Sequence, residues 1–198
     1  MRITAFAAAA LSAALAVSPA VAAKLRFTPD TFQIYGGLNN PDAARQANRR
    51  TTRETVRFQT SLKPGSIVVR TAERRLYLVL GAGQAIAYPV GVGREGFTWS
   101  GTNRITRKSV WPEWRPPQVM LEREHAKGHM IPDFMAGGPD NPLGARALYI
   151  GNTEYRIHGT TQPWSIGLAV SSGCIRMMND QIIDLFNRVK VGAVVVVE

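Results

Sequence analysis

The sequence of 198 residues is poor in the side chains that form disulfides and hold metals, with one cysteine and three histidines. A single cysteine cannot close a disulfide within the chain, so its thiol is either buried and inert or kept for chemistry. His125 and His129 have the i, i+4 spacing of a helical chelate. However, Gly128 and Pro132 interrupt that helix and no third ligand is evident. We therefore predict neither a metal nor a cofactor.

Long apolar runs are absent except at the N-terminus. The first 23 residues combine Arg2, the apolar run Ala5–Val17 and small residues around Val21, which is typical of a cleaved secretory signal peptide. The run is short for a membrane span of about 20 residues. We expect residues 1–23 to be removed, with no transmembrane span in the mature protein. No cysteine lies at the cleavage site, which argues against a lipid anchor.

Acidic residues are also scarce, since 14 Asp and Glu face 24 Lys and Arg and leave a formal net charge of +10. A basic exported protein favours acidic partners such as anionic headgroups or an acidic cell-wall polymer. Nucleic acid is not an expected partner outside the cell. Solubility alone is the alternative explanation, and the charge by itself does not decide between them.

Residues 24–60 are polar and broken by glycine and asparagine, which predicts an N-terminal arm with little core of its own. From residue 61 to 198 the pattern changes to short β-rich runs separated by turn residues, with a hairpin around GAGQ. The expected strands are IVVR (67–70), RLYLVL (75–80), QAIAYPVGVG (84–93), TNRITRKSV (102–110), ALYIG (147–151), EYRIHG (154–159) and AVVVVE (193–198).

One amphipathic helix is expected near the C-terminus, in NDQIIDLFNRVKVG. Asn179 is its predicted N-cap, and Lys190 and Gly192 are expected to close it. Six of the chain's 12 prolines lie between Trp111 and Pro142. A long Pro/Gly-rich segment inside a compact domain is usually a functional loop, so we predict a lid there, with a short helix at PQVMLEREHA.

Cys174 and His158 are the best candidates for chemistry. His158 ends a predicted strand and Cys174 lies in SSGC before the helix, so a loop that folds back could bring them together. Such a pair supports nucleophilic catalysis, in which the thiolate attacks and the imidazole carries the proton. Gly173 gives a substrate carbonyl access to the backbone, and Arg176 adds positive charge that could lower the thiol pKa or hold a carboxylate. No third partner is identified from the residues alone.

The stretch IHGTTQPWSIGLAVSSGCIRMMN resembles the motif of the L,D-transpeptidase family, the YkuD-type catalytic domain of bacterial cell-wall enzymes. PGSIVVRTAERRLYLVLGAGQAIAYPVGVGREGFTWSG resembles the opening strands of that family, and GPDNPLGARALYI its approach to the histidine. The resemblance covers residues 61–198 and is of the Gram-negative periplasmic type. It implies a mainly β, sandwich-like catalytic domain with a C-terminal helix and a lid insertion, exported to the periplasm.

The resemblance also implies roles for residues at matching positions. Cys174 would be the nucleophile, His158 its base, and the carbonyl of Gly159 would orient the imidazole in place of a carboxylate. The N–H groups of Ser172, Gly173 and Cys174 would form the oxyanion hole. Many members carry histidine where this chain has Ser172, and a serine there keeps the backbone donors.

The implied substrate is the peptidoglycan stem peptide, a tetrapeptide cut after its third residue with release of D-alanine. An amine would then resolve the thioester, either from another stem, giving a 3–3 cross-link, or from an envelope protein to be anchored. Water as the acceptor would make the protein an L,D-carboxypeptidase or hydrolase, and both activities need the same residues. A non-catalytic wall-binding module is a third class, against which the Cys174–His158 pair argues.

Overall fold

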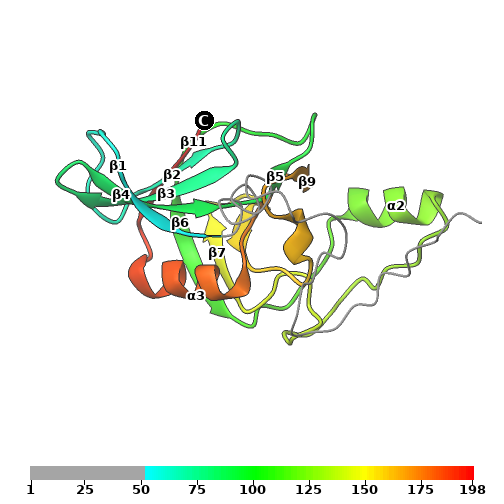
Figure 1. The fold of residues 1–198 in the computed structure, drawn as a ribbon. Helices are drawn as coiled ribbons and strands as arrows, with labels where there is room; N and C mark the ends of the chain where they lie inside the picture. The colour runs from blue at the N-terminus through cyan, green and yellow to red at the C-terminus, as the bar shows by residue number, and fades with distance from the viewer. Residues whose placement is uncertain (1–51) are drawn as a thin grey trace, which may run out of the picture. The chain divides into compact units, whose positions relative to one another are not determined.

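The computed structural model describes residues 52–198. The predicted signal peptide and most of the predicted arm lie outside these residues. The strands are β1 (Glu54–Arg57), β2 (Ile67–Arg70), β3 (Arg75–Gly81), β4 (Gln84–Pro89), β5 (Val92–Gly93), β6 (Gly101–Val110), β7 (Arg146–Ile150), β8 (Arg156–His158), β9 (Ala169–Ser171), β10 (Ile175–Arg176) and β11 (Val194–Val197). The helices are α2 (Gln118–Ala126), a short 3₁₀ turn η1 (Pro163–Ser165) and α3 (Asn179–Arg188). Figure 1 shows their arrangement.

Nine of the strands form one sheet in the order β1-β4-β3-β2-β11-β6-β7-β8-β10, and β5 pairs with β9 separately. The C-terminal strand β11 therefore lies inside the sheet, parallel to β2 and antiparallel to β6. The ten-residue strand β6 pairs with β11 on one side and β7 on the other, so it joins two halves that a sandwich would keep separate. The mainly β prediction is confirmed, with the two layers joined through β6.

The predicted hairpin at GAGQ joins β3 and β4. Its turn needs positive φ at Gly81 (94°), Ala82 (50°) and Gly83 (71°). Glycine has no Cβ to strain such a backbone, which explains two of these three positions. The predicted strand 84–93 is split, because the chain leaves β4 at Pro89 and resumes as β5 at Val92.

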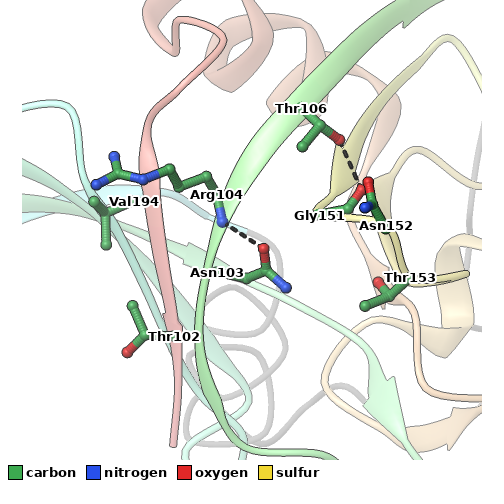
Figure 2. A pocket seen from close by; sticks show the side chains of 8 residues that line it. All are labelled: Thr102, Asn103, Arg104, Thr106, Gly151, Asn152, Thr153 and Val194. Carbon is green, nitrogen blue, oxygen red and sulfur yellow. Dashed lines mark hydrogen bonds between the residues drawn. The ribbon is translucent and has the colours of Figure 1, made fainter.

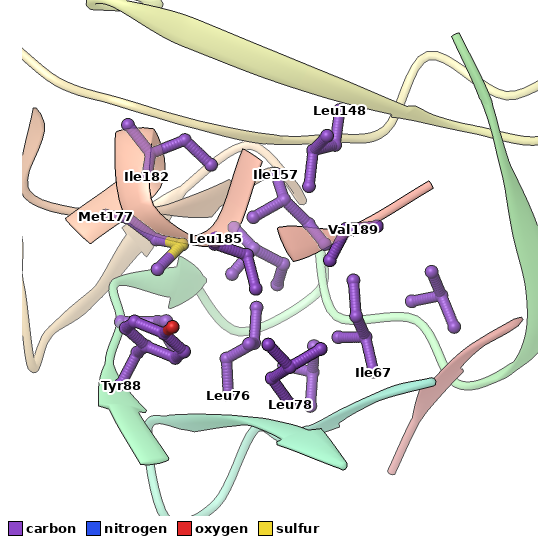
Figure 3. Close-up of a cluster of buried hydrophobic side chains, with 14 of the residues drawn as sticks. Ile67, Leu76, Leu78, Tyr88, Leu148, Ile157, Met177, Ile182, Leu185 and Val189 are labelled. Atoms are coloured by element: carbon purple, nitrogen blue, oxygen red, sulfur yellow. The ribbon is translucent and has the colours of Figure 1, made fainter. Parts of the chain in front are cut away.

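The main core lies between the two halves of the sheet and α3 (Figure 3). It combines Leu76 and Leu78 of β3, Leu148 of β7, and Ile182 and Leu185 of α3, each at most 2% exposed. Burial of such a side chain contributes about 1.5–3 kcal/mol before packing is counted. The core thus anchors both β3 and β7 on α3 and fixes the strands beside them.

A smaller cluster covers the opposite face of β2 and β3, and it corrects one expectation about the arm. β1 pairs antiparallel with β4, and Phe58 is only 7% exposed against Val68 and Val79. The Phe58 ring stacks on Tyr77 with centroids 4.7 Å apart. Residues 54–58, predicted as part of an arm with little core of its own, therefore belong to the sheet, because β1 pairs with β4 and Phe58 packs in this cluster.

Helix α3 packs beside β7 (Figure 1) and corrects the predicted cap. The N-cap is Met178, and no side chain caps the helix there. The Asn179 side chain instead accepts from the Ala145 amide at 3.0 Å and donates to the Thr160 carbonyl at 3.1 Å. At the other end the helix closes at Arg188 rather than near Gly192, and the Lys108 ammonium donates to its terminal carbonyls.

The Pro/Gly-rich segment 111–142 contains α2, close to the helix predicted at 117–126. No residue of α2 is buried, and the segment folds on itself through a bridge between Trp114 and Met135. Val119 is 65% exposed and Met130 83%. None of the helices within residues 52–198 combines the length and apolarity needed to cross a membrane.

Candidate active site

The edge of the sheet formed by β8 and β10 carries the residues predicted to do chemistry. The two strands are parallel, with Ile175 paired to Ile157. Both isoleucines are buried in the main core. Side chains alternate between the two faces of a strand, so the neighbours of these isoleucines face away from the core. Those neighbours are Arg156, His158, Cys174 and Arg176.

These four side chains line one cavity of about 130 Å³. Ser172 lines it too, so four of the predicted site residues share one space. The rest of the wall comes from Pro142, Leu143, Glu154, Tyr155 and Ser171, and from Trp114, Pro117 and Met120 of the segment 111–142. A segment distant in sequence therefore closes one side of the cavity.

His158 is only 4% exposed, and its ring orientation is set by its neighbour. Nδ1 lies 2.6 Å from the carbonyl oxygen of Gly159. A carbonyl can only accept, so Nδ1 carries a proton and Nε2 is the basic nitrogen of the neutral ring. Burial lowers the pKa of His158 to about 3. The positive charges of Arg176 and Arg156 also lower this pKa, whereas the hydrogen bond to the Gly159 carbonyl opposes the shift. The imidazole is therefore neutral at pH 7.

Cys174 is half-buried and has no disulfide partner. Its thiol donates to the carbonyl of Glu154 at a sulfur–oxygen distance of 3.8 Å. Burial raises the pKa of the thiol, while the charge and hydrogen bonds of Arg156 and the charge of Arg176 oppose that shift. The resting site thus pairs a neutral imidazole with a protonated thiol, next to two cations.

The turn before Cys174 is held by hydrogen bonds on both sides. The buried Ser171 hydroxyl donates to the carbonyl of Cys174 at 2.6 Å and accepts from the Gly173 amide at 3.2 Å. The Trp99 indole donates to the Gly173 carbonyl at 3.2 Å and stacks on Tyr155 with ring centroids 5.0 Å apart. C=O and N–H point in opposite directions across a trans peptide, so the Cys174 amide points away from Trp99.

Two glycines are required because other side chains approach their backbone closely, and not only because they give a substrate access. Gly173 has φ +105° and a Cβ there would collide with the Tyr155 ring. A Cβ on Gly159 would collide with Oδ1 of Asn179. That oxygen accepts hydrogen bonds from the backbone amides of Ala145 and Thr160. The sequence motif therefore encodes packing around the turn as well as chemistry.

Sequence reasoning missed several residues at this site. Arg156 faces the cavity two residues before His158, and the strand period of EYRIH could have placed it there. Ser171 lies within the quoted SSGC motif, but no sequence pattern indicates the hydrogen bonds of its hydroxyl. Trp99 and Tyr155 lie far apart in the sequence, and no sequence pattern links either of them to Gly173.

The two remaining histidines lie apart from the cavity lining. His125 is on α2, while His129 follows the helix end and places Nδ1 3.2 Å from Oε2 of Glu124. Among residues 52–198 no group of three or more His, Cys, Asp or Glu side chains is arranged to hold a metal.

A second, more open hollow of about 660 Å³ lies between β6, the turn after β7 and β11 (Figure 2). Several of its polar side chains hydrogen-bond to nearby backbone. Thr106 donates to the Gly151 carbonyl at 2.8 Å, and Asn103 accepts from the Arg104 amide at 2.8 Å. With neither the cysteine nor a histidine among its lining residues, this hollow is not the candidate active site.

Comparison with protein families now identifies the domain. The model of the L,D-transpeptidase catalytic domain, YkuD, matches residues 64–197. The chain belongs to the L,D-transpeptidase family. The matched residues include every strand from β2 onward and both strands that carry the cavity.

Curated relatives share this family name. The probable L,D-transpeptidase YbiS of Escherichia coli K12 is 42% identical over 131 residues, which are 64% of this chain and 42% of that protein. The probable L,D-transpeptidase ErfK/SrfK of the same strain is 44% identical over 132 residues, 64% of this chain and 41% of that protein. The chain thus spans less than half the length of these relatives.

Solved L,D-transpeptidase structures share the fold at low identity. The enzyme from Mycobacterium smegmatis superposes with a TM-score of 0.50 at 19% identity, covering 67% of this chain and 57% of that one. L,D-transpeptidase 3 from Mycobacterium tuberculosis gives 0.50 at 14% identity, covering 83% and 89%. The sheet described above is therefore the fold of the family.

Proposed function

We propose that this domain is a peptidoglycan L,D-transpeptidase that transfers the acyl group of a tetrapeptide stem through a thioester on Cys174. The observation that carries the proposal is the shared cavity of Cys174 and His158, on one face of two parallel strands in an L,D-transpeptidase domain. The chain has no other cysteine, so the thioester has one possible site.

In the first half-reaction Sγ of Cys174 attacks the carbonyl carbon of the third stem residue, and Nε2 of His158 takes the thiol proton. The resting thiol is protonated, so this transfer generates the nucleophile rather than a standing thiolate. The Gly159 carbonyl stabilises the imidazolium through Nδ1–H. The tetrahedral intermediate collapses when the C–N bond breaks, and His158 returns the proton to the leaving amine of D-alanine.

The oxyanion of that intermediate needs backbone donors. The Ser172 and Cys174 amides are the proposed donors, with the latter held in direction by the Trp99–Gly173 bond. The Gly173 amide, also predicted as a donor, is already bonded to the Ser171 hydroxyl. It therefore contributes by shaping the turn, and the hole requires two amides rather than three.

In the second half-reaction an amine attacks the thioester carbon and His158 accepts the amine proton. The C–S bond then breaks and His158 returns the proton to the sulfur, which regenerates the thiol. The acceptor is a stem amine, giving a 3–3 cross-link, or an amine of an envelope protein. We propose that residues 1–23 direct the chain to the periplasm, where this substrate lies, and that residues 111–142 act as a lid over the cavity.

The test is incubation with purified tetrapeptide muropeptides and analysis of the products by mass. We expect release of D-alanine together with a dimer linked through third residues. Tripeptide alone would instead identify the L,D-carboxypeptidase activity, in which water resolves the same thioester. Unchanged tetrapeptide with a protein that folds normally would contradict both activities.

A further inference from the structure

Two arginines in the cavity lack an acidic partner. Arg156 and Arg176 flank His158 on the same face of β8 and β10, and neither takes part in any ion pair found within residues 52–198. An uncompensated charge that is partly removed from water is costly. A ligand that brings negative charge into the cavity would offset that cost.

The two arginines differ in what they already bind. Arg176 donates to Oε1 of Gln162 at 3.1 Å, so part of its donor set is used. Nε of Arg156 is buried and has no hydrogen-bond partner in the described chain. The Arg156 guanidinium carbon lies 5.4 Å from the centroid of the Tyr149 ring, which supports the group without neutralising it. Arg156 is therefore the more available of the two.

Arg156 is also the arginine whose charge acts more strongly on the thiol. It lines the same cavity as Cys174, and its positive charge lowers the thiol pKa more than that of Arg176 does. A donor peptide that ends in D-alanine places its terminal carboxylate carbon three bonds from the carbonyl carbon that Sγ attacks. A cation beside Sγ is thus within reach of that carboxylate when the peptide is bound for attack.

We propose that Arg156 binds the free terminal carboxylate of the donor peptide and so restricts the enzyme to stems that end in an acid one residue after the cleaved bond. This role rests on the proposed function and adds a specificity-determining residue to it. A guanidinium offers paired donors to a carboxylate, whereas a peptide chain that continues beyond this residue offers only a neutral amide. Longer or amidated stems are then poor donors.

The experiment compares two proteins, each with two donor peptides. Wild type and Arg156→Gln are each given the tetrapeptide with a free C-terminus and its C-terminal amide, and kcat/KM is measured from the release of D-alanine or its amide. We expect amidation to reduce kcat/KM of wild type about 10- to 100-fold, the scale of a hydrogen bond to a charged group. We expect Arg156→Gln to lose as much on the free acid and nothing more on the amide.

Arg176→Gln is the matched control and should keep the full penalty for amidation. Equal losses by Arg156→Gln on both donors would overturn the proposal, because Arg156 would then act on the thiol rather than on the carboxylate. Full activity of Arg156→Gln on the free acid would overturn it as well.

A binding measurement separates this inference from the proposed reaction. The Cys174→Ser protein and its Arg156→Gln derivative are titrated with both tetrapeptides by calorimetry. We expect amidation to weaken binding only when Arg156 is present. If wild type releases no D-alanine but this difference in binding remains, the proposed function fails and the carboxylate site stands. If amidation leaves binding to Cys174→Ser unchanged, the carboxylate site fails, whatever the activity.

Discussion

The charged groups at the end of α2 are paired with one another, whereas the cations at the β8/β10 edge are not paired with acidic groups. Glu124 accepts from Arg123, Lys127 and His129, and these partners lower the pKa of its carboxyl to about 2. His158 also has a lowered pKa, to about 3, but there burial and the nearby arginines disfavour the charged form. One region therefore pairs its charges near water, whereas the other keeps a base neutral and leaves cations without anions.

This difference indicates where ligand chemistry resides. Pairs such as Lys127–Glu124 and His129–Glu124, whose basic partners are more than half exposed, satisfy one another and contribute little to stability. The β8/β10 edge instead holds a thiol, an imidazole and two guanidinium groups, and these two cations have no acidic partner among residues 52–198. The comparison predicts large effects on activity at the edge and small ones on α2.

The largest effect is expected at the cysteine. Cys174→Ala and Cys174→Ser should abolish turnover of tetrapeptide stems, because no other thiol can form the thioester. Circular dichroism should show a native fold, since the side chain is only half-buried. Turnover by folded Cys174→Ala would show that Cys174 at the β8/β10 edge is not the nucleophile.

The histidines give the next contrast. His158→Ala should lose about 10²–10⁴-fold in the acylation rate, the usual scale for a positioned proton transfer. His125→Ala and His129→Ala on the α2 side should stay close to wild type, and a chelator should have no effect. Stopped-flow or quenched measurement of acyl-enzyme formation gives these rates. Inhibition by EDTA would reopen the metal hypothesis for His125 and His129.

The backbone of the turn should matter more than the Ser172 side chain. Ser172→Pro removes one proposed oxyanion donor, and the loss of such a donor costs about 10²–10³-fold. Ser172→Ala keeps the amide and should retain most activity. The two rates are compared after circular dichroism has confirmed that the proline variant folds. Equal damage in both folded variants would assign a role to the hydroxyl and contradict the backbone account.

The smallest effect concerns stability and pH. Between pH 6.5 and about 3 the unfolded chain protonates His158 while the native site does not, so native stability should fall as pH decreases, by about 1.4 kcal/mol per unit. His158→Gln should remove this slope from urea unfolding measured between pH 6.5 and 4.5. Glu124→Gln should leave that window unchanged, because its stabilising charge is lost only as pH falls from about 4.5 toward 2. Equal slopes in wild type and His158→Gln would show that the imidazole is not kept neutral by burial.

The sequence predicted much of this molecule because the informative patterns were local. Short β-rich runs bounded by turn residues predicted β2 and β3, a continuous apolar run predicted β11, and a glycine-rich turn predicted the hairpin. Cys174 and His158 were identified by residue type and motif. Their placement on one face depends on the parallel pairing of β8 with β10, which no local pattern specifies.

Two of the errors concern side-chain hydrogen bonds that the residue pattern does not reveal, one between distant segments and one within the turn. Asn179 looked like a helix cap, but its amide bonds to the backbone at Ala145, 34 residues away. The Gly173 amide looked free, but the Ser171 hydroxyl accepts from it. The strand period of EYRIH places Arg156 on the face of His158, but its lack of an acidic partner among residues 52–198 is visible only in the structure.

Covalent capture of the thiol tests the central claim most directly. Wild-type protein is treated with a carbapenem, whose strained β-lactam carbonyl is a reactive acyl donor, and its intact mass is measured before peptide mapping. The account predicts one added carbapenem mass, located on Cys174, and none on Cys174→Ala. An adduct on the alanine variant, or an adduct of wild type mapped to any other residue, would contradict the assignment of Cys174 as the nucleophile.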